Sequence, residues 1–325
     1  MFRLTFVGLC LLAAICFAAR SPAADRARAS YAALNASQSP LWVAQERGFY
    51  AKYGLDVDLL YISSGSLNVQ ALVGGTVQFA AGGPAAVEAR LRGIKLSIIA
   101  NPLPVLASNL VSLPEIKSVQ DLKSRVGGIS RFGSSTDQGV HYLFRKNGLS
   151  EKEIKLLQLG ADANRLAALK IGKIQYTFLG AAASEQARSQ GFRILATAQQ
   201  MGIPFPWTSA VVNDAWLESN REMAYRYVKA LTEAIWFMKR NRPESEAVIA
   251  KYMRINDRRL AAAEYEFNIA LLPDLPYPTL DGVRLILDNL AQDNPEARHR
   301  DPDEFVDRSA VDRLKREQFV QTLGK

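Results

Sequence analysis

The chain has 325 residues, of which 48% are hydrophobic and 22% are charged. This is the composition of a folded globular protein with room for about two domains. Two cysteines and two histidines are too few for a disulfide scaffold or a four-thiolate zinc site, and we predict neither a metal nor a cofactor. The formal net charge of +8 suits an acidic ligand or an anionic membrane. Because the basic residues are spread along the chain, we expect no nucleic-acid partner.

The N-terminal segment has the pattern of an export signal. Arg3 is followed by an uncharged apolar stretch from Leu4 to Ala19, which is shorter than the ~20 apolar residues of a transmembrane helix. Small residues come next, so we predict a signal peptide within residues 1–29. Cleavage is expected between residues 23 and 29, after Ala23 or after Ala29. The mature chain would then be soluble, free of cysteine and located in the periplasm, whereas the alternative is a retained membrane anchor.

Strand and helix patterns alternate along the first two thirds of the chain. In the first unit, strands are predicted at 31–34, 57–62 and 96–100, and helices at 40–53, 67–73 and 84–92. In the second, strands are predicted at 125–130, 154–159, 176–179 and 194–196, and helices at 118–123, 135–147, 162–171 and 181–190. Residues 207–213 form a strand that returns to the first unit, and the pattern is helical from 219 onward. Such repeated units predict an α/β protein with a mainly parallel sheet covered by helices.

Several phrases of the sequence occur in the order expected for one known family. The main one is SQSPLWVAQERGFYAKYGLDV at 37–57, and others lie at 72–81, 116–123, 133–136 and 169–175. With them the chain resembles the nitrate/sulfonate/taurine and thiamine-precursor class of periplasmic solute-binding proteins, which serve ABC importers. The resemblance implies a type II periplasmic binding protein fold, in which two α/β lobes close around a ligand by a hinge motion. Lobe 1 would comprise 30–108 and 212–325, and lobe 2 would comprise 109–211.

Four loops rich in glycine and serine connect a predicted strand to a predicted helix. Ligands of open α/β sheets bind at the carboxyl ends of strands, and the N–H groups at the start of a helix attract anions. Serine and threonine hydroxyls add hydrogen bonds, while glycine lets the backbone approach a ligand closely. The predicted ligand-binding residues of these loops are Ser37, Gln38, Ser39, Ser64, Gly65, Ser66, Gly82, Gly83, Gly133, Ser134, Ser135 and Thr136. The alternative is that each loop is an ordinary helix cap.

Two further residues complete the predicted site. Gly180 lies in the segment FLGAAA at 178–183, where sulfonate binders of the family often have an aromatic and acidic phrase. Small residues there predict a roomier, less polar wall and a larger, partly apolar organic acid. Trp207, which lies close to Pro204 and Pro206 in the sequence, is expected either to stack on the ligand or to pack in the core.

The predicted function is capture of a small anionic organic solute, a sulfonate, a carboxylate or a pyrimidine-like compound, by a monomer that delivers it to an ABC permease with its cytoplasmic ATPase. The sequence contains no P-loop, dinucleotide fingerprint or nucleophile elbow, and we predict no enzyme. His141 is expected on a helix face and not as a general base. The alternatives are an enzyme on the same fold, of the pyrimidine or menaquinone pathway type, or a secreted ligand sensor without transport.

Overall fold

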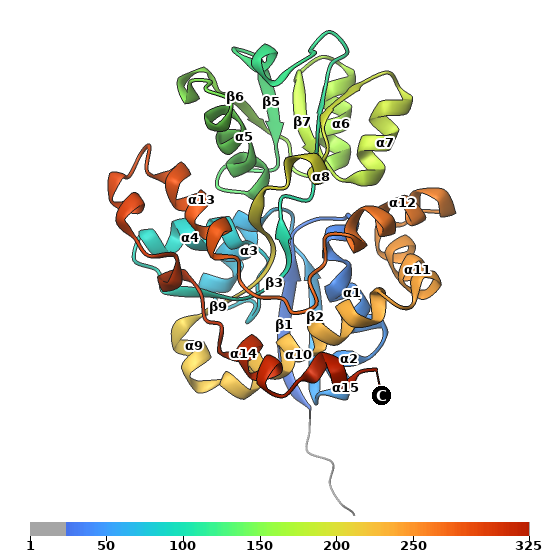
Figure 1. The fold of residues 1–325 in the computed structure, drawn as a ribbon, viewed down its shortest axis with the longest axis vertical. Coiled ribbons are helices and arrows are strands. Elements are labelled where there is room, and N and C mark those ends of the chain that lie inside the picture. The colour runs from blue at the N-terminus through green and yellow to red at the C-terminus, as the bar shows by residue number, and fades with distance from the viewer. Residues whose placement is uncertain (1–23, 325) are drawn as a thin grey trace, which may run out of the picture.

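The computed structural model describes residues 24–324, so most of the predicted signal peptide lies outside the described residues. The strands of the lower lobe in Figure 1 are β1 (Asp25–Tyr31), β2 (Leu55–Tyr61), β3 (Leu96–Val105) and β9 (Pro204–Asn213). β1 and β2 are parallel, whereas β3 and β9 are antiparallel. Bridges from Ala29 to Phe79 and from Ala80 to Val211 connect the two pairs. One mixed sheet therefore forms the centre of this lobe.

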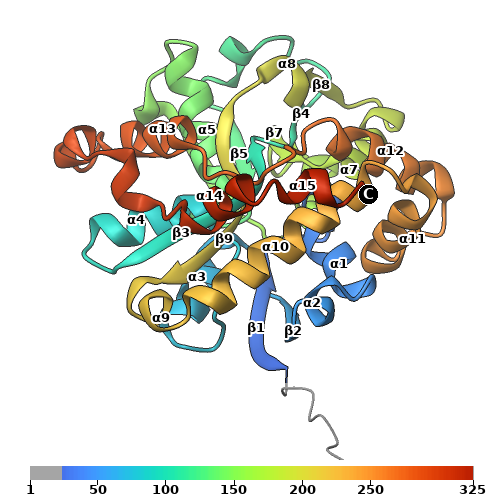
Figure 2. The same ribbon diagram turned by 60° about the horizontal axis from the view of Figure 1, so that its bottom comes forward.

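Helices cover both faces of the sheet in this lower lobe, which is called the first lobe below. They are α1 (Ser39–Glu46), α2 (Phe49–Lys52), α3 (Gly65–Val73), α4 (Gly83–Leu91), α9 (Asp214–Ser219), α10 (Arg221–Met238), α11 (Arg242–Met253), α12 (Arg258–Ile269), α13 (Leu280–Leu290), α14 (Ser309–Arg316) and α15 (Phe319–Thr322), with the 3-10 turns η1 (Ala36–Gln38), η4 (Pro295–His299) and η5 (Pro302–Phe305). Figure 2 shows α10 and α14 crossing the underside. Tyr227, Leu231 and Ile235 of α10 recur at helical spacing and are almost completely buried, as the sequence pattern predicted.

The second lobe, which is the upper one in Figure 1, has a sheet of five strands in the order β6-β5-β7-β4-β8. These strands are β4 (Asn109–Ser112), β5 (Val126–Ile129), β6 (Lys155–Gln158), β7 (Tyr176–Leu179) and β8 (Arg193–Ala196); the helices are α5 (Ser135–Lys146), α6 (Asp162–Lys170), α7 (Ala181–Ser189) and α8 (Ala198–Met201), with η2 (Val119–Leu122) and η3 (Glu151–Glu153). Phe178 packs in one cluster with α5, and its neighbour Leu179 packs in another with α6 and α7. Because successive side chains of a strand face opposite ways, α5 covers one face of the sheet and α6 and α7 cover the other.

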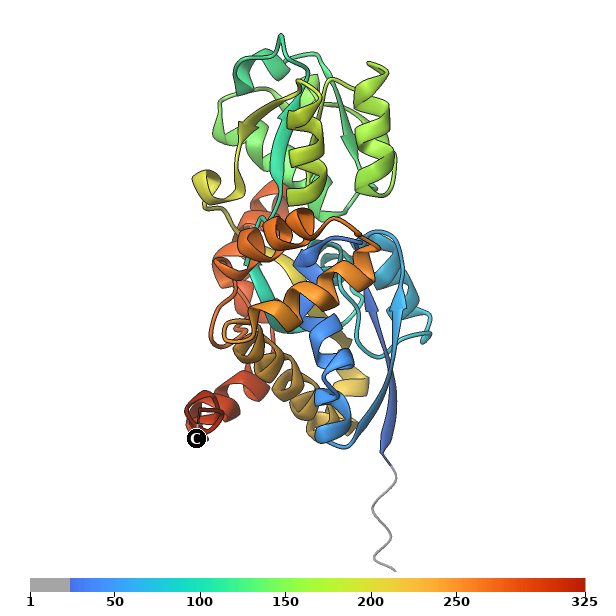
Figure 3. The same ribbon diagram turned by 90° about the vertical axis from the view of Figure 1, so that its right-hand side faces the viewer.

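Two segments join the lobes, which lie one above the other in Figure 3. One runs from β3 to β4 through residues 106–108, and the other runs from β8 to β9 through residues 197–203. β9 pairs with β3 from Pro204 to Asn213. We therefore propose that the second lobe ends before Pro204, and not at residue 211 as the sequence analysis expected. Among residues 24–324, none of the helices combines the length and hydrophobicity that spanning a bilayer requires.

The order of strands and helices follows the sequence prediction, but the predicted helix at 40–53 is divided into α1 and α2 by Gly48, which has φ +69°, and three further differences concern the strands. The first strand spans Asp25–Tyr31 and not 31–34. The strand Asn109–Ser112 was not predicted, and it runs antiparallel to both of its neighbours. The pair β3 and β9 is antiparallel as well. The expectation of a mainly parallel sheet therefore holds for β1 with β2 and for β5 with β6 and β7, but not near the two connections between the lobes.

Candidate functional site

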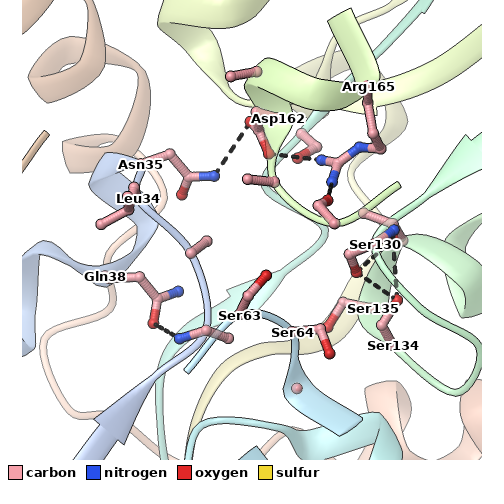
Figure 4. Close-up of a pocket in the computed structure, with 18 of the residues that line it drawn as sticks. Leu34, Asn35, Gln38, Ser63, Ser64, Ser130, Ser134, Ser135, Asp162 and Arg165 are labelled. Atoms are coloured by element: carbon pink, nitrogen blue, oxygen red, sulfur yellow. Dashed lines mark hydrogen bonds and ion pairs between the residues drawn. The ribbon is translucent and has the colours of Figure 1, made fainter. Parts of the chain in front are cut away.

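A cavity of about 270 Å³ lies between the two lobes (Figure 4). The segments 32–35, 61–65, 130–136 and 160–165 supply most of its wall. These segments follow β1, β2, β5 and β6, respectively, so the cavity lies at the carboxyl ends of parallel strands from both lobes. This is the position in which open α/β sheets bind ligands. Ser108 of the first connection, Trp207 of β9 and Met253 of α11 complete the wall.

Half of the predicted binding residues line this cavity. They are Gln38, Ser64, Gly65, Ser134, Ser135, Thr136 and Trp207. Gln38 is 2% exposed, and its amide nitrogen donates to Ser37 Oγ at 2.9 Å and to Thr208 Oγ1 at 3.1 Å. Trp207 is half-buried, lines the cavity and packs near Phe205. Contact of these residues with a ligand remains a prediction.

The other predicted residues lie behind or beside the cavity wall. Ser37 and Ser39 are buried, and their hydroxyls donate to Asn35 Oδ1 and to the carbonyl of Ala36, both at 2.6 Å. These two serines therefore shape the turn between β1 and α1. The side-chain cap of this turn is Asn35, whose Oδ1 accepts from the N–H of Ser37, and no side-chain hydrogen bond caps the start of α1.

Gly82 and Gly83 bring backbone segments into close contact. A Cβ on Gly82 would lie 2.6 Å from the carbonyl oxygen of Gly65, and one on Gly83 would lie 2.6 Å from that of Pro206. The backbone N–H of Gly83 also donates to Ser209 Oγ at 3.1 Å. The absence of a side chain at these two glycines therefore allows α3, α4 and β9 to pack closely together.

Ser66, Gly133 and Gly180 lie where the two lobes touch. Ser66 Oγ of α3 donates to the carbonyl of Phe132 in the second lobe at 2.8 Å. Gly133 has φ +72°, and a Cβ there would lie 2.7 Å from Glu88 Oε2 of the first lobe. The N–H of Gly180 donates to Asp162 Oδ2 at 2.8 Å. Of these contacts, the hydrogen bond from Ser66 joins the two lobes, and none of the three residues lines the cavity.

The charged residues of the cavity were not predicted from the sequence. Among the described residues that line it, only Asp162 and Arg165 are charged, and Arg165 is 3% exposed. Arg165 Nη2 donates to Asp162 Oδ1 at 2.6 Å and to the carbonyl of Phe178 at 3.1 Å. Asn35 of the first lobe also donates to Asp162, Oδ2 accepting at 3.5 Å. The two charges therefore compensate each other.

Hydroxyl groups make up a second polar part of the wall, beside the charged pair and the amides of Asn35 and Gln38. Ser130, Ser134 and Thr136 form a closed set, with Oγ–Oγ distances of 2.8, 3.0 and 3.1 Å. Ser135, the first residue of α5, and Ser63 lie beside them on the wall. Ser64 has φ +81° although it is not glycine. A strained, buried serine at a cavity wall is typical of a functional loop.

The apolar part of the wall comes from the first lobe. Leu34 is 44% exposed and Tyr61 is 38% exposed, and Trp207 and Met253 lie beside them on the wall. Exposed side chains of this size are costly unless something covers them. The cavity thus presents large apolar side chains from the first lobe and hydroxyl groups from both lobes.

His141 lies outside the cavity wall. It belongs to α5, and its Nδ1 is 2.7 Å from Glu151 Oε2. Burial lowers the pKa of His141, but the hydrogen bonds and charges of Asp137 and Glu151 outweigh burial and raise the pKa to about 9. The imidazole is therefore held as a cation in a partly buried network with Asp137 and Glu151. No cluster of three or more metal-binding side chains occurs within residues 24–324.

Two lobes with a cavity at the strand ends define the type II periplasmic binding protein fold. Residues 35–245 match the family model described as NMT1/THI5 like, and the chain belongs to this family. A relative from Brucella abortus (strain 2308), described only as a binding protein, is 25% identical over 223 residues, which are 67% of this chain and 68% of the relative.

Solved structures with the same fold come from several bacteria. The periplasmic aliphatic sulphonate binding protein SsuA from Escherichia coli is 19% identical, with a TM-score of 0.68 over 89% of this chain and 93% of SsuA. The periplasmic nitrate-binding protein NrtA from Synechocystis PCC 6803 is 16% identical, with a TM-score of 0.71 over 90% of this chain and 88% of NrtA. A protein from Bordetella bronchiseptica RB50 is 21% identical, with a TM-score of 0.79 over 90% of this chain and 98% of that chain. The predicted family resemblance and fold are confirmed.

Proposed function

We propose that this chain is the extracytoplasmic solute-binding protein of an ABC importer. In this role it captures a small organic solute in the cavity between its lobes and delivers it to a permease driven by a cytoplasmic ATPase. The observation that carries the proposal is the cavity itself, because its wall comes from strand ends of both lobes. The family membership and the fold it shares with periplasmic binding proteins support the same role.

The two sides of the cavity indicate the class of solute. We infer an anionic group, a carboxylate or a sulfonate, bound by neutral donors, because Arg165 is already paired with Asp162 at 2.6 Å. Ser135 and the N–H groups that begin α5 and α3 are the donors available on the wall, and the start of a helix favours negative charge. The apolar part of the solute would lie against Tyr61 and Trp207. A cavity of about 270 Å³ suits a compact organic acid.

A thermal-shift screen of the mature protein tests this proposal. The panel contains alkanesulfonates, aromatic and aliphatic carboxylates, pyrimidines and nitrate, followed by calorimetric titration of each hit. A solute at 100 times its dissociation constant stabilises the folded chain by about 2.7 kcal/mol. We expect stabilisation by an organic acid with an apolar part and little by nitrate. Stabilisation by uncharged pyrimidines alone would contradict the inferred anionic group.

Two further measurements separate the proposed role from its alternatives. Mass spectrometry of the bound solute after prolonged incubation distinguishes binding from catalysis, and steady product formation would favour an enzyme on the same fold. Stimulation of the ATPase activity of a reconstituted transporter by the solute-loaded protein distinguishes import from sensing. We expect recovery of unchanged solute and a stimulated ATPase.

A further inference from the structure

The carboxylate of Glu264 lies between the two lobes and binds to both. Glu264 belongs to α12 of the first lobe and is 1% exposed. Its Oε2 accepts a hydrogen bond from the N–H of Ala36 in the same lobe at 3.0 Å. Its Oε1 accepts one from the N–H of Ala182 in the second lobe at 2.5 Å. One side chain therefore spans the boundary between the lobes with two charge-assisted hydrogen bonds.

Both N–H groups lie at the start of a helical segment. Ala36 begins η1, and Ala182 is the second residue of α7. The N–H groups of a first turn have no partner within their own helix, and a carboxylate is the group that best compensates them. Because Glu264 accepts hydrogen bonds from first-turn N–H groups in two different lobes, both N–H groups are bonded to it only when the lobes are together.

Apart from the side-chain amide of Asn268, which donates to Oε2 at 3.5 Å, Glu264 depends on these two N–H donors. Burial raises the pKa of Glu264 to about 7, the N–H groups of Ala182 and Ala36 lower it, and the negative charge of Asp162 raises it. The two hydrogen bonds therefore favour the ionised carboxylate against desolvation and against a charge of the same sign. Withdrawing the Ala182 N–H would remove one of these two compensating bonds.

The same contact adjoins the cavity. Ala36 follows Asn35, and Ala182 lies two residues beyond Gly180. The side chain of Asn35 and the N–H of Gly180 both donate to Asp162 Oδ2, at 3.5 and 2.8 Å. Glu264 thus fixes the two segments, one in each lobe, that meet at Asp162 on the cavity wall. Figure 4 shows the contact of Asn35 with Asp162.

We propose that Glu264 is a positioning residue that latches the two lobes in their closed arrangement. It does not line the cavity and acts through the segments that do. The consequence for solute retention rests on the proposed function, since a weaker latch would release a bound solute faster. The latch itself is a property of the chain without solute and is tested without one.

The sharpest variant is Ala182→Pro, because it removes the donor of the second lobe and leaves Glu264 and its own lobe unchanged. Proline is accepted in the first turn of a helix. Ala181→Pro is the matched control, since it places the same ring one residue earlier and keeps the Ala182 N–H. Glu264→Gln is a second variant, because glutamine has one acceptor oxygen in place of two. Its NH₂ group must therefore face one of the two N–H donors, and that hydrogen bond is lost. Glu266→Gln, at an exposed residue of the same helix, is its control.

Closure can be measured by single-molecule fluorescence transfer between dyes on the two lobes. The mature chain has no cysteine, so Val73→Cys on α3 and Lys170→Cys on α6, both at exposed positions, provide the only labelling sites. Without added solute, we expect Ala182→Pro and Glu264→Gln to lower the ratio of closed to open molecules about tenfold. The two controls should match the unsubstituted chain. Equal ratios in Ala182→Pro and Ala181→Pro would overturn the proposal, as would a shift in Glu266→Gln as large as that in Glu264→Gln.

Discussion

Arg165 and Asp162 face each other across the first turn of α6, with Arg165 Nη2 2.6 Å from Asp162 Oδ1. The guanidinium also donates to the carbonyls of Gly160 and Phe178. Asp162 in turn accepts from the N–H of Gly180 at 2.8 Å. This pair therefore ties the loop after β6 to the end of β7 and sets the electrostatics of the cavity, because each charge compensates the other.

Asp162→Ala should destabilise the chain by about 3–5 kcal/mol, because it leaves a buried arginine without its counter-charge. The N–H of Gly180 would lose its acceptor as well. Urea unfolding of the unsubstituted chain and the variant measures the difference. The double variant Asp162→Ala/Arg165→Met should be less destabilised than the sum of the two single variants, since the pair is coupled. Additive effects would contradict the coupling.

The pKa of His141 makes stability dependent on pH. The folded chain holds His141 with a pKa of about 9, against about 6.5 in an unfolded chain. A raised pKa means that the folded state binds the proton more tightly, so the stabilisation is fully present below about pH 6.5 and is lost as the pH rises through 9. Relative to His141→Gln, the unsubstituted chain should be more stable at pH 6 by on the order of 1–3 kcal/mol.

Chemical denaturation of both proteins between pH 6 and pH 10 measures this effect. The difference in unfolding free energy should shrink over the interval from 6.5 to 9. His299→Gln is the matched control, because His299 is exposed in η4. A difference that stays constant with pH would show that the contacts of His141 with Asp137 and Glu151 do not depend on its charge.

The sequence predicted the part of the site that has a local signature. A strand, a loop of glycine and serine and a helix recur around Ser64 and Ser134, and both residues line the cavity. The same signature includes Gly82 and Gly83, which lie outside the wall, because a glycine needed for backbone packing looks the same in sequence as one that admits a ligand. Only the three-dimensional neighbours, Gly65 and Pro206, distinguish the two.

The charged part of the site has no such signature. Asp162 and Arg165 are three residues apart on a helix, which in sequence is the pattern of a solvent-exposed ion pair. Burial of Arg165 to 3% comes from the loop after β6 and from β7, which no local pattern specifies. Glu264 was missed for the same reason, since its partners Ala36 and Ala182 are distant in the chain.

The start of β1 narrows the prediction for the mature N-terminus. Cleavage after Ala23 would keep the whole strand Asp25–Tyr31, whereas cleavage after Ala29 would remove five of its seven residues. The removed segment pairs with β2 from Leu55 to Leu59 and includes Ala29, which is fully buried. We therefore expect exported protein to begin at Ala24. Intact-mass measurement decides between the two sites, and a product beginning at Ser30 would contradict this choice.

Ser135 is the first residue of α5. Ser135 lines the cavity, whereas the hydroxyls of Ser130, Ser134 and Thr136 bond to each other. If the start of α5 binds an anionic group, Ser135→Asp places a negative charge where the charge of the solute lies. Affinity should fall at least about tenfold, because a hydrogen bond to a charged group contributes about 1.5–3 kcal/mol and repulsion adds to its loss.

Folding should be little affected by this substitution, since an acidic residue is favourable in the first turn of a helix. Ser150→Asp is the matched control, because Ser150 is an exposed serine at the start of η3 and lies outside the cavity wall. Calorimetric titration of the three proteins with the tightest-binding organic acid of the screen gives the dissociation constants, and thermal unfolding checks the fold. An unchanged dissociation constant for Ser135→Asp would remove the start of α5 from the anion site and leave the N-terminal end of α3, at Ser64 and Gly65, as the remaining candidate.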